Sequence, residues 1–147
     1  MSDALLDRAA DVAFARLEAA GGDPRRLEEP YGTFVTVFSA QGVLDNGGLR
    51  YFLGNAWPGE PPYAHFSASY RTLGAAAAAD TIDEAVRLLA LAAPERDADA
   101  RLERLGGPVG DRIEALNERI DGDEVWRRLS AFVRAHEVAF SDGAADR

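Results

Sequence analysis

Apolar residues recur at steps of three and four along most of this chain, and Gly or Pro interrupts the pattern at intervals. This spacing places apolar side chains on one face of an α-helix, whereas a strand would need them at every second position. The clearest example runs from Val125 through Leu129, Phe132 and Val133 to Phe140. The pattern therefore predicts an all-α protein of about seven or eight helices.

The Gly and Pro breaks give the expected bounds of the helices. Gly21-Gly22 and Pro94 are expected to end two of them, and Gly106-Gly107-Pro108 to separate two more. A capping box at Thr81 and Glu84 offers an alternative start for the Ala-rich helix, but five consecutive Ala favour a start at Ala75. Helices are expected over 3–20, 33–44, 49–53, 63–73, 75–92, twice within 102–120, and over 125–140. Residues 1–140 are expected to form a single helical domain, and 141–147 a polar, frayed tail.

Residues 33–44 are the ambiguous part of this prediction. Phe34, Val35, Val37 and Phe38 lie beside two Thr, a composition that is also typical of a strand. A lone strand without a partner is unstable in water, so a helix is expected. Asn46-Gly47-Gly48 then predicts a turn before the short segment 49–53.

The net charge of the chain limits the kinds of macromolecule that it can bind. The chain carries 25 acidic residues against 16 basic ones, all of them Arg, for a net charge of −9. Such a protein is repelled by nucleic acid and by anionic membranes, so a basic protein is the expected partner. Residues 80–124 hold 13 acids against six Arg, a net −7. Twelve of these acids form the expected partner surface: Asp80, Asp83, Glu84, Asp97, Asp99, Glu103, Asp111, Glu114, Glu118, Asp121, Asp123 and Glu124.

The alternative is an ordinary solvated face. Helical pairs at i,i+4, such as Asp83–Arg87 and Asp97–Arg101, would neutralise these acids locally. Asp121 is also expected to cap the last helix.

No catalytic, metal-binding or cofactor-binding residue is predicted. Cys and Lys are absent, and no metal-ligand spacing or phosphate-binding loop is present. His136 lies on the apolar stripe of the last helix and is expected to pack at the edge of the core; His65 lies one position off a neighbouring stripe. Apolar runs are too short to span a bilayer, and the N-terminus lacks the pattern of a secretory signal, so a cytoplasmic location is expected.

Residues 46–55 resemble a motif of the form N-G-G-[FL]-x-Q-[YF]-[FY]-x-N, although its Gln is missing here. Leu73-Gly74-Ala75, followed by Ala79, Ile82 and Ala85, is similar to a second element of the same family. The family is a small all-helical bacterial family of unknown function that includes DNA-mimic proteins. The resemblance implies an all-α fold, which can form a homodimer, and one member type that occupies the DNA-binding face of a transcription factor.

The residues of the motif have a structural interpretation. Asn46 would cap backbone groups, Gly47-Gly48 would allow the turn, Tyr51 and Phe52 would anchor the segment in the core, and Asn55 would bond to backbone. A binding surface around Asn46, Tyr51, Asn55 and Trp57 is the alternative.

Three functions follow from these observations. The first is an acidic macromolecule-binding protein, and a DNA mimic that occupies the basic surface of a DNA-binding protein is one form of it. The second is a toxin-neutralising or regulatory partner that acts by shape. The third is a small enzyme with a site near Trp57, Tyr63 and His65, which is the least favoured because no set of reactive residues converges there.

Overall fold

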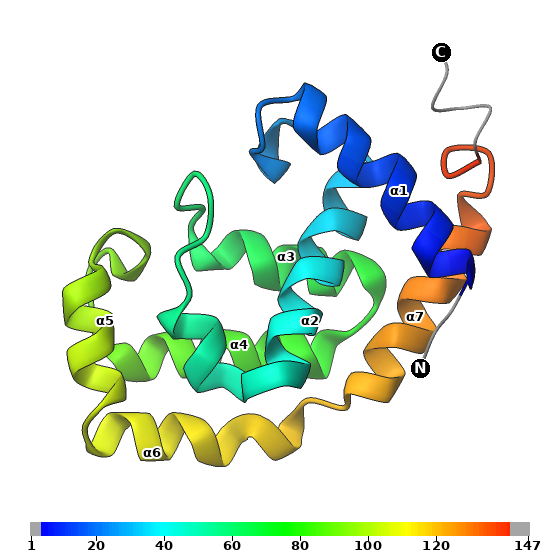
Figure 1. Cartoon of the computed structure of the whole chain (residues 1–147). Coiled ribbons are helices and arrows are strands. Elements are labelled where there is room, and N and C mark those ends of the chain that lie inside the picture. Colours follow the sequence, from blue (N-terminus) through cyan, green and yellow to red (C-terminus); the bar gives the residue numbers. More distant parts are fainter. Residues whose placement is uncertain (1–3, 142–147) are drawn as a thin grey trace.

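The computed structural model describes residues 4–141, and the helices it contains are drawn in Figure 1. Helix α1 spans Ala4–Ala19 and buries Leu6, Ala9, Val12 and Ala13 on one face. It ends at Gly21-Gly22 as expected, with the Gly22 amide donating to the Leu17 carbonyl at 2.9 Å. The expected first residue of this helix, Asp3, lies outside the described residues. The short 3₁₀ helix η1, Pro24–Arg26, then leads to the centre of the fold.

Helix α2, Tyr31–Gly54, is the central element. It packs against α1, α3, α5, α6 and α7, and residues 31–37 are all buried. A segment covered on every side has apolar residues all round, which explains why its sequence resembles a strand. The helix predicted over 33–44 is confirmed.

The turn predicted at Asn46-Gly47-Gly48 is wrong. The chain bends at Gly48, whose φ is 71° and ψ −166°, and then resumes the helix, so residues 49–53 form the second part of α2. Glycine reaches this backbone conformation without the steric penalty that other residues incur.

Helices α3, Tyr63–Leu73, and α4, Ala76–Leu89, follow the loop at 55–62 and pack against each other. Gly74 ends α3, and the Ala75 amide donates to the Tyr70 carbonyl at 2.9 Å. The start predicted near Ala75 is confirmed. Thr81 lies inside α4, where its hydroxyl donates to the Ala77 carbonyl at 2.8 Å, so the alternative start there is wrong.

The next elements form the border of the molecule opposite α1. They are the 3₁₀ helix η2, Pro94–Arg96, helix α5, Ala98–Leu105, helix α6, Pro108–Glu114, and the 3₁₀ helix η3, Ala115–Arg119. The break predicted at Gly106-Gly107-Pro108 separates α5 from α6. Leu102 lies three positions before the buried Leu105, a spacing typical of one apolar face, but 56% of it is exposed.

Helix α7 spans Gly122–Ala135, and the predicted cap is present: an Asp121 carboxylate oxygen accepts from the Glu124 amide at 3.1 Å. The helix was expected to reach Phe140 but ends five residues earlier. Phe140 is still buried, because the chain turns and its ring packs against Tyr31 at 5.5 Å and Phe34 at 5.2 Å. Of the tail expected at 141–147, residues 142–147 lie outside the described part.

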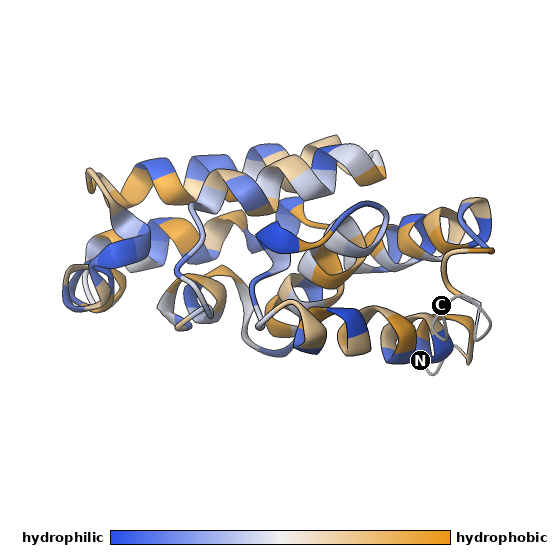
Figure 2. Cartoon of the chain, turned by 90° about the horizontal axis from the view of Figure 1, so that it is seen from above, coloured by the Kyte–Doolittle hydropathy of each residue, from blue (hydrophilic) through white to orange (hydrophobic). Residues whose placement is uncertain are grey.

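Each of the seven α-helices of residues 4–141 contributes to one hydrophobic core. Figure 1 shows α2 running between α1 and α7 at one end and α5 and α6 at the other. In Figure 2 apolar and polar stretches alternate along the helices, as amphipathic packing requires. This part of the chain contains no strand, so the all-α prediction is confirmed. None of its helices is long and apolar enough to cross a membrane.

A chain of polar side chains, buried at Tyr70 and Gln41 and exposed at Asp45, joins three helices. The Tyr70 hydroxyl donates to the Gln41 side-chain oxygen at 2.9 Å, and the Gln41 amide donates to Asp45 at 2.8 Å. The Trp126 indole donates to the other Asp45 oxygen at 2.6 Å. These bonds fix α3 and the start of α7 against the middle of α2.

Candidate functional site

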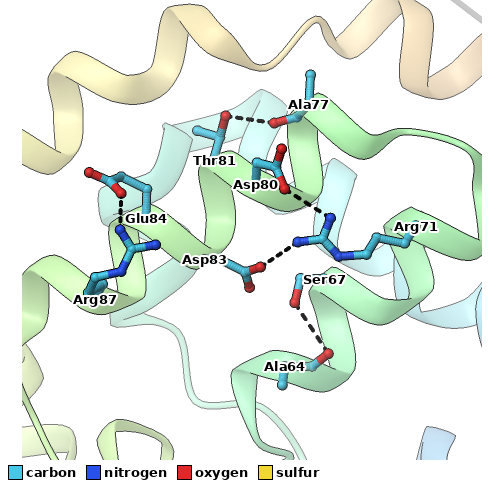
Figure 3. A network of polar contacts seen from close by, with 9 residues as sticks. All are labelled: Ala64, Ser67, Arg71, Ala77, Asp80, Thr81, Asp83, Glu84 and Arg87. Atoms are coloured by element: carbon cyan, nitrogen blue, oxygen red, sulfur yellow. Dashed lines mark hydrogen bonds and ion pairs between the residues drawn. The ribbon is translucent and has the colours of Figure 1, made fainter.

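Two pairs of surface carboxylates are each held by one arginine from another helix. The first, which we call the Arg71 pair, consists of Asp80 and Asp83 on α4. The Arg71 guanidinium on α3 donates to them at 2.9 and 2.6 Å, and it lies between them in Figure 3. These bonds, with the one to Asp80 contributing most, raise the pKa of Arg71. The two acids are one helical turn apart, which lets one planar guanidinium reach both.

The second set, the Arg50 pair, consists of Asp111 and Glu114 on α6. The Arg50 side chain on α2 donates to Asp111 at 3.2 Å and to Glu114 at 2.7 Å. It also donates to the Leu105 carbonyl at 2.5 Å, which fixes the guanidinium in place. The hydrogen bond to Glu114 is the main reason that the pKa of Arg50 is raised. Each arginine with its two carboxylates therefore keeps a formal charge of −1.

The other acids of the predicted surface have different roles. Glu84 pairs with Arg87, and Glu124 with Arg128 at 2.8 Å. Asp97 and Asp121 accept hydrogen bonds from the amides of Ala100 and Glu124 as helix caps. Within residues 4–141, five acids of the segment have neither an ion pair nor a capping bond: Glu95, Asp99, Glu103, Glu118 and Asp123.

Both helical ion pairs predicted from spacing are wrong. Asp83 pairs with Arg71 instead of Arg87, and Arg101 is buried and contacts backbone carbonyls. Arg50, Arg71 and Arg128, all from outside 80–124, pair with five acids of this segment. With these three included, 13 acids face nine arginines, so the local excess of negative charge is smaller than the sequence suggests.

An open groove lies beside the Arg71 pair. Its walls include Asp80, Asp83 and Glu84 on α4, together with Arg87 and Arg119. Figure 3 shows Asp80, Asp83 and Glu84 following one another along this helix. Residues of α4 and η3 form the walls of this groove. Asp111 and Glu114, the acids of the Arg50 pair, are not among them.

The motif at 46–55 surrounds the kink of α2. The Leu49 amide, which directly follows the kink, donates to the Asn117 side-chain oxygen at 2.8 Å. A Cβ at position 48 would lie 2.8 Å from the Asn117 side chain, so glycine is required there for space as well as for conformation. Asn46 was expected to serve as the capping residue but is exposed, and Asn117 takes that role.

The predictions for four other residues of the motif region have different outcomes. Phe52 is fully buried as predicted, but Tyr51 is 48% exposed, and its ring covers Gly47. Asn55 is half-buried at the end of α2, and its side chain forms no backbone hydrogen bond to residues 4–141. Trp57 donates to the Phe52 carbonyl at 3.2 Å and packs against Phe66.

The two histidines do not form a reactive pair. His65 is half-buried and its Nε2 lies 3.0 Å from the Thr36 hydroxyl; burial lowers its pKa. His136 was expected at the edge of the core, but it is exposed at the end of α7 and stacks on Phe132, with ring centroids 4.4 Å apart. No group of three or more His, Asp or Glu in the described part is arranged to hold a metal ion.

These features define an acidic, all-helical protein, built around a kinked central helix, in which arginines hold paired carboxylates at the surface. The sequence matches the family of DMP19-like proteins over residues 25–136. The chain therefore belongs to the DMP19-like family, a family of DNA-mimic proteins, and the resemblance based on residues 46–55 is confirmed. It matches no curated protein and no solved structure.

Sequence reasoning missed four residues that organise the site: Arg50, Arg71, Arg101 and Asn117. Each bonds to a residue of another element, so the spacing along one helix contains no signal for it. Arg50 alone could have been noticed, because it lies within the family motif.

Proposed function

We propose that this chain binds a basic protein as a DNA mimic, occupying a surface that otherwise contacts DNA. The observation that carries the proposal is the match to a DNA-mimic family over residues that include the whole acidic segment 80–124. The formal charge of −9 supports it, because a negative protein attracts a basic partner and repels nucleic acid. Cytoplasmic location and a homodimeric state are further parts of the proposal.

The arginine-held pairs give this proposal a physical basis. Each pair keeps one net negative charge, as a DNA phosphate does. Its side chains are already fixed by hydrogen bonds at 2.6–3.2 Å, so less conformational freedom is lost when a partner binds. The two arginines therefore lower the total negative charge of the surface, and they hold the remaining negative charge at fixed positions.

The test is displacement of DNA. Purified DNA-binding proteins from the same cell are each loaded with a labelled duplex, and the chain is added while fluorescence anisotropy is followed. We expect release of the duplex from at least one of them. The affinity of the chain for that protein, measured directly without DNA, should fall steeply as salt rises from ~0.05 to ~0.2 M, because the complex is electrostatic. Failure to release any duplex would contradict the proposal.

Two charge-matched variants locate the surface. Asp80→Asn/Asp83→Asn removes the Arg71 pair, and Asp7→Asn/Asp11→Asn removes two exposed acids of α1. Both variants change the net charge by the same amount. We expect the first to weaken displacement about tenfold and the second to have little effect. Equal losses would mean that only total charge matters.

A regulatory or toxin-neutralising partner that acts by shape is the second candidate. It is favoured by the exposure of Tyr51 and Leu102, because exposed aromatic and aliphatic side chains are common anchors at interfaces. Such a complex would keep its affinity at high salt.

The region around Trp57, Tyr63 and His65 supports binding instead of catalysis. The polar groups of these three side chains form hydrogen bonds within the fold, to Phe52, Leu53 and Thr36.

A further inference from the structure

A small cavity lies between the end of α2, the loop at 55–62 and the start of α5. Its volume of about 80 Å³ is room for roughly five to eight water-sized groups. Residues from three parts of the chain line it, among them Asn55, Trp57, Glu60, Tyr63, Glu95 and Arg101. Neither the acidic pairs nor His65 contributes to its wall.

Arg101 is the unusual residue of this cavity. It is only 4% exposed, and its Nε and Nη1 donate to the carbonyls of Leu53 at 2.8 Å and Pro94 at 2.7 Å. The first of these bonds satisfies a carbonyl at the end of α2, where a cation is favourable. Among residues 4–141 no carboxylate lies within 4 Å of this guanidinium, and its Nη2 forms no hydrogen bond.

A buried charge without a counter-charge is costly to the fold. The two carbonyls reduce that cost but leave one full positive charge at the wall of a cavity. An anionic group entering the cavity would supply a counter-charge in direct contact with the guanidinium, which no carboxylate of residues 4–141 provides.

Two acids, Glu60 and Glu95, also line the cavity. Glu60 is exposed and Glu95 is half-buried, so they lie nearer to solvent than Arg101. Two aromatic side chains belong to the same wall. Trp57 has its indole N–H occupied by the Phe52 carbonyl, and Tyr63 directs its hydroxyl to the Leu53 carbonyl at 3.4 Å.

We propose that this cavity binds a small zwitterion, a free α-amino acid or a compound with the same two groups. The carboxylate would pair with Arg101, and the ammonium group would lie beside Glu60 and Glu95. A simple anion would be repelled by the two glutamates, and a simple cation would leave Arg101 without a counter-charge. The inference does not depend on DNA mimicry.

The test follows the indole N–H signal of Trp57 by NMR in the full chain during titration with glycine or L-alanine. Acetate and methylammonium, each with one of the two charged groups, are the matched probes. We expect saturable shifts with the amino acids and about tenfold weaker binding of either single-charge probe. No saturable shift up to ~50 mM of both amino acids would overturn the proposal, as would equal binding of acetate.

Variants then test both kinds of charged side chain. Glu95→Gln should weaken glycine binding about tenfold, whereas Glu103→Gln, an exposed change on α5 outside the cavity, should leave it unchanged. Arg101→Gln should abolish binding; circular dichroism checks that this variant is folded. If it does not fold, Glu60→Gln/Glu95→Gln decides the matter, and unchanged glycine binding in that variant would overturn the proposal.

Discussion

Directly after the kink in α2, the backbone amide of Leu49 donates to a side chain from another element. Asn117 supplies the acceptor from η3, 68 positions further along the chain. The adjacent Gly48 has no Cβ, and this absence gives the Asn117 side chain the space to approach. A partly buried amide that loses such a partner destabilises the fold by the cost of its desolvation. Asn117 is therefore the residue on which the geometry of the motif depends.

We expect Asn117→Ala to lower the free energy of unfolding by about 1–2 kcal/mol, because the Leu49 amide would be left unpaired. Asn46→Ala is the matched control, and its effect should stay within about 0.5 kcal/mol because Asn46 is exposed. Urea denaturation followed by circular dichroism measures both values. A larger loss for Asn46→Ala would contradict this interpretation of the motif.

Spacing along the sequence could not have identified Asn117. Asn46 was chosen because it precedes two glycines, the usual position of a turn residue. The true acceptor comes from another element and becomes a neighbour only through tertiary packing. The same reason explains Tyr51: a helix that changes direction at Gly48 moves the following residues to a different face, which a uniform helical period does not describe.

At the scale of the elements, two glycines of α2 have opposite roles. Gly48 has a φ of 71° and produces the kink, whereas Gly42 lies in an exposed helical position where an added Cβ meets nothing within 4 Å. The first glycine is needed for the bend, and the second only adds freedom to the unfolded chain.

Gly48→Ala should therefore destabilise the protein by about 1–3 kcal/mol, since alanine is strained at this φ and would collide with Asn117. Gly42→Ala should stabilise it by about 0.5–1 kcal/mol. Thermal unfolding of the two variants gives midpoints that move in opposite directions. If both midpoints fall, the bend is not what distinguishes the two positions.

Most helices were predictable because periodic apolar spacing is a local property. The end of α5, the start of α6 and the start of α7 follow Gly, Pro and Asp signals in the sequence. The end of α7 does not, because Phe140 keeps the helical spacing but reaches the core through a turn that packs it on Tyr31 and Phe34. Burial alone therefore could not decide where this helix stops.

At the scale of the whole molecule, the charge is organised between helices. Arginines of α2, α3 and α7 pair with acids of α4, α6 and the first turn of α7. The negative segment was predictable from composition, but its partial neutralisation was not, because Arg50 and Arg71 approach it only in the folded state. The protein therefore keeps a net charge of −9, and its ion pairs hold the charged side chains at fixed positions.

Removing two of these arginines should make the fold sensitive to salt. We expect Arg71→Gln/Arg128→Gln to lower the melting temperature at ~10 mM salt, and the loss to shrink at ~0.5 M, where charge repulsion is screened. Arg104→Gln/Arg112→Gln has the same net charge but removes exposed arginines that form no ion pair within the described residues, so its loss should be smaller. Equal losses would show that total charge alone governs stability.

The contact between the first turn of α2 and the segment after α7 has a consequence for biosynthesis. The Tyr31 hydroxyl donates to the Ala139 carbonyl at 2.8 Å, across 108 positions of the chain. A ribosome makes the aromatic start of α2 well before the segment that covers it, so the rings of Tyr31 and Phe34 lack that cover until the segment after α7 has been made. Until then the nascent polypeptide presents an exposed aromatic surface that chaperones can bind.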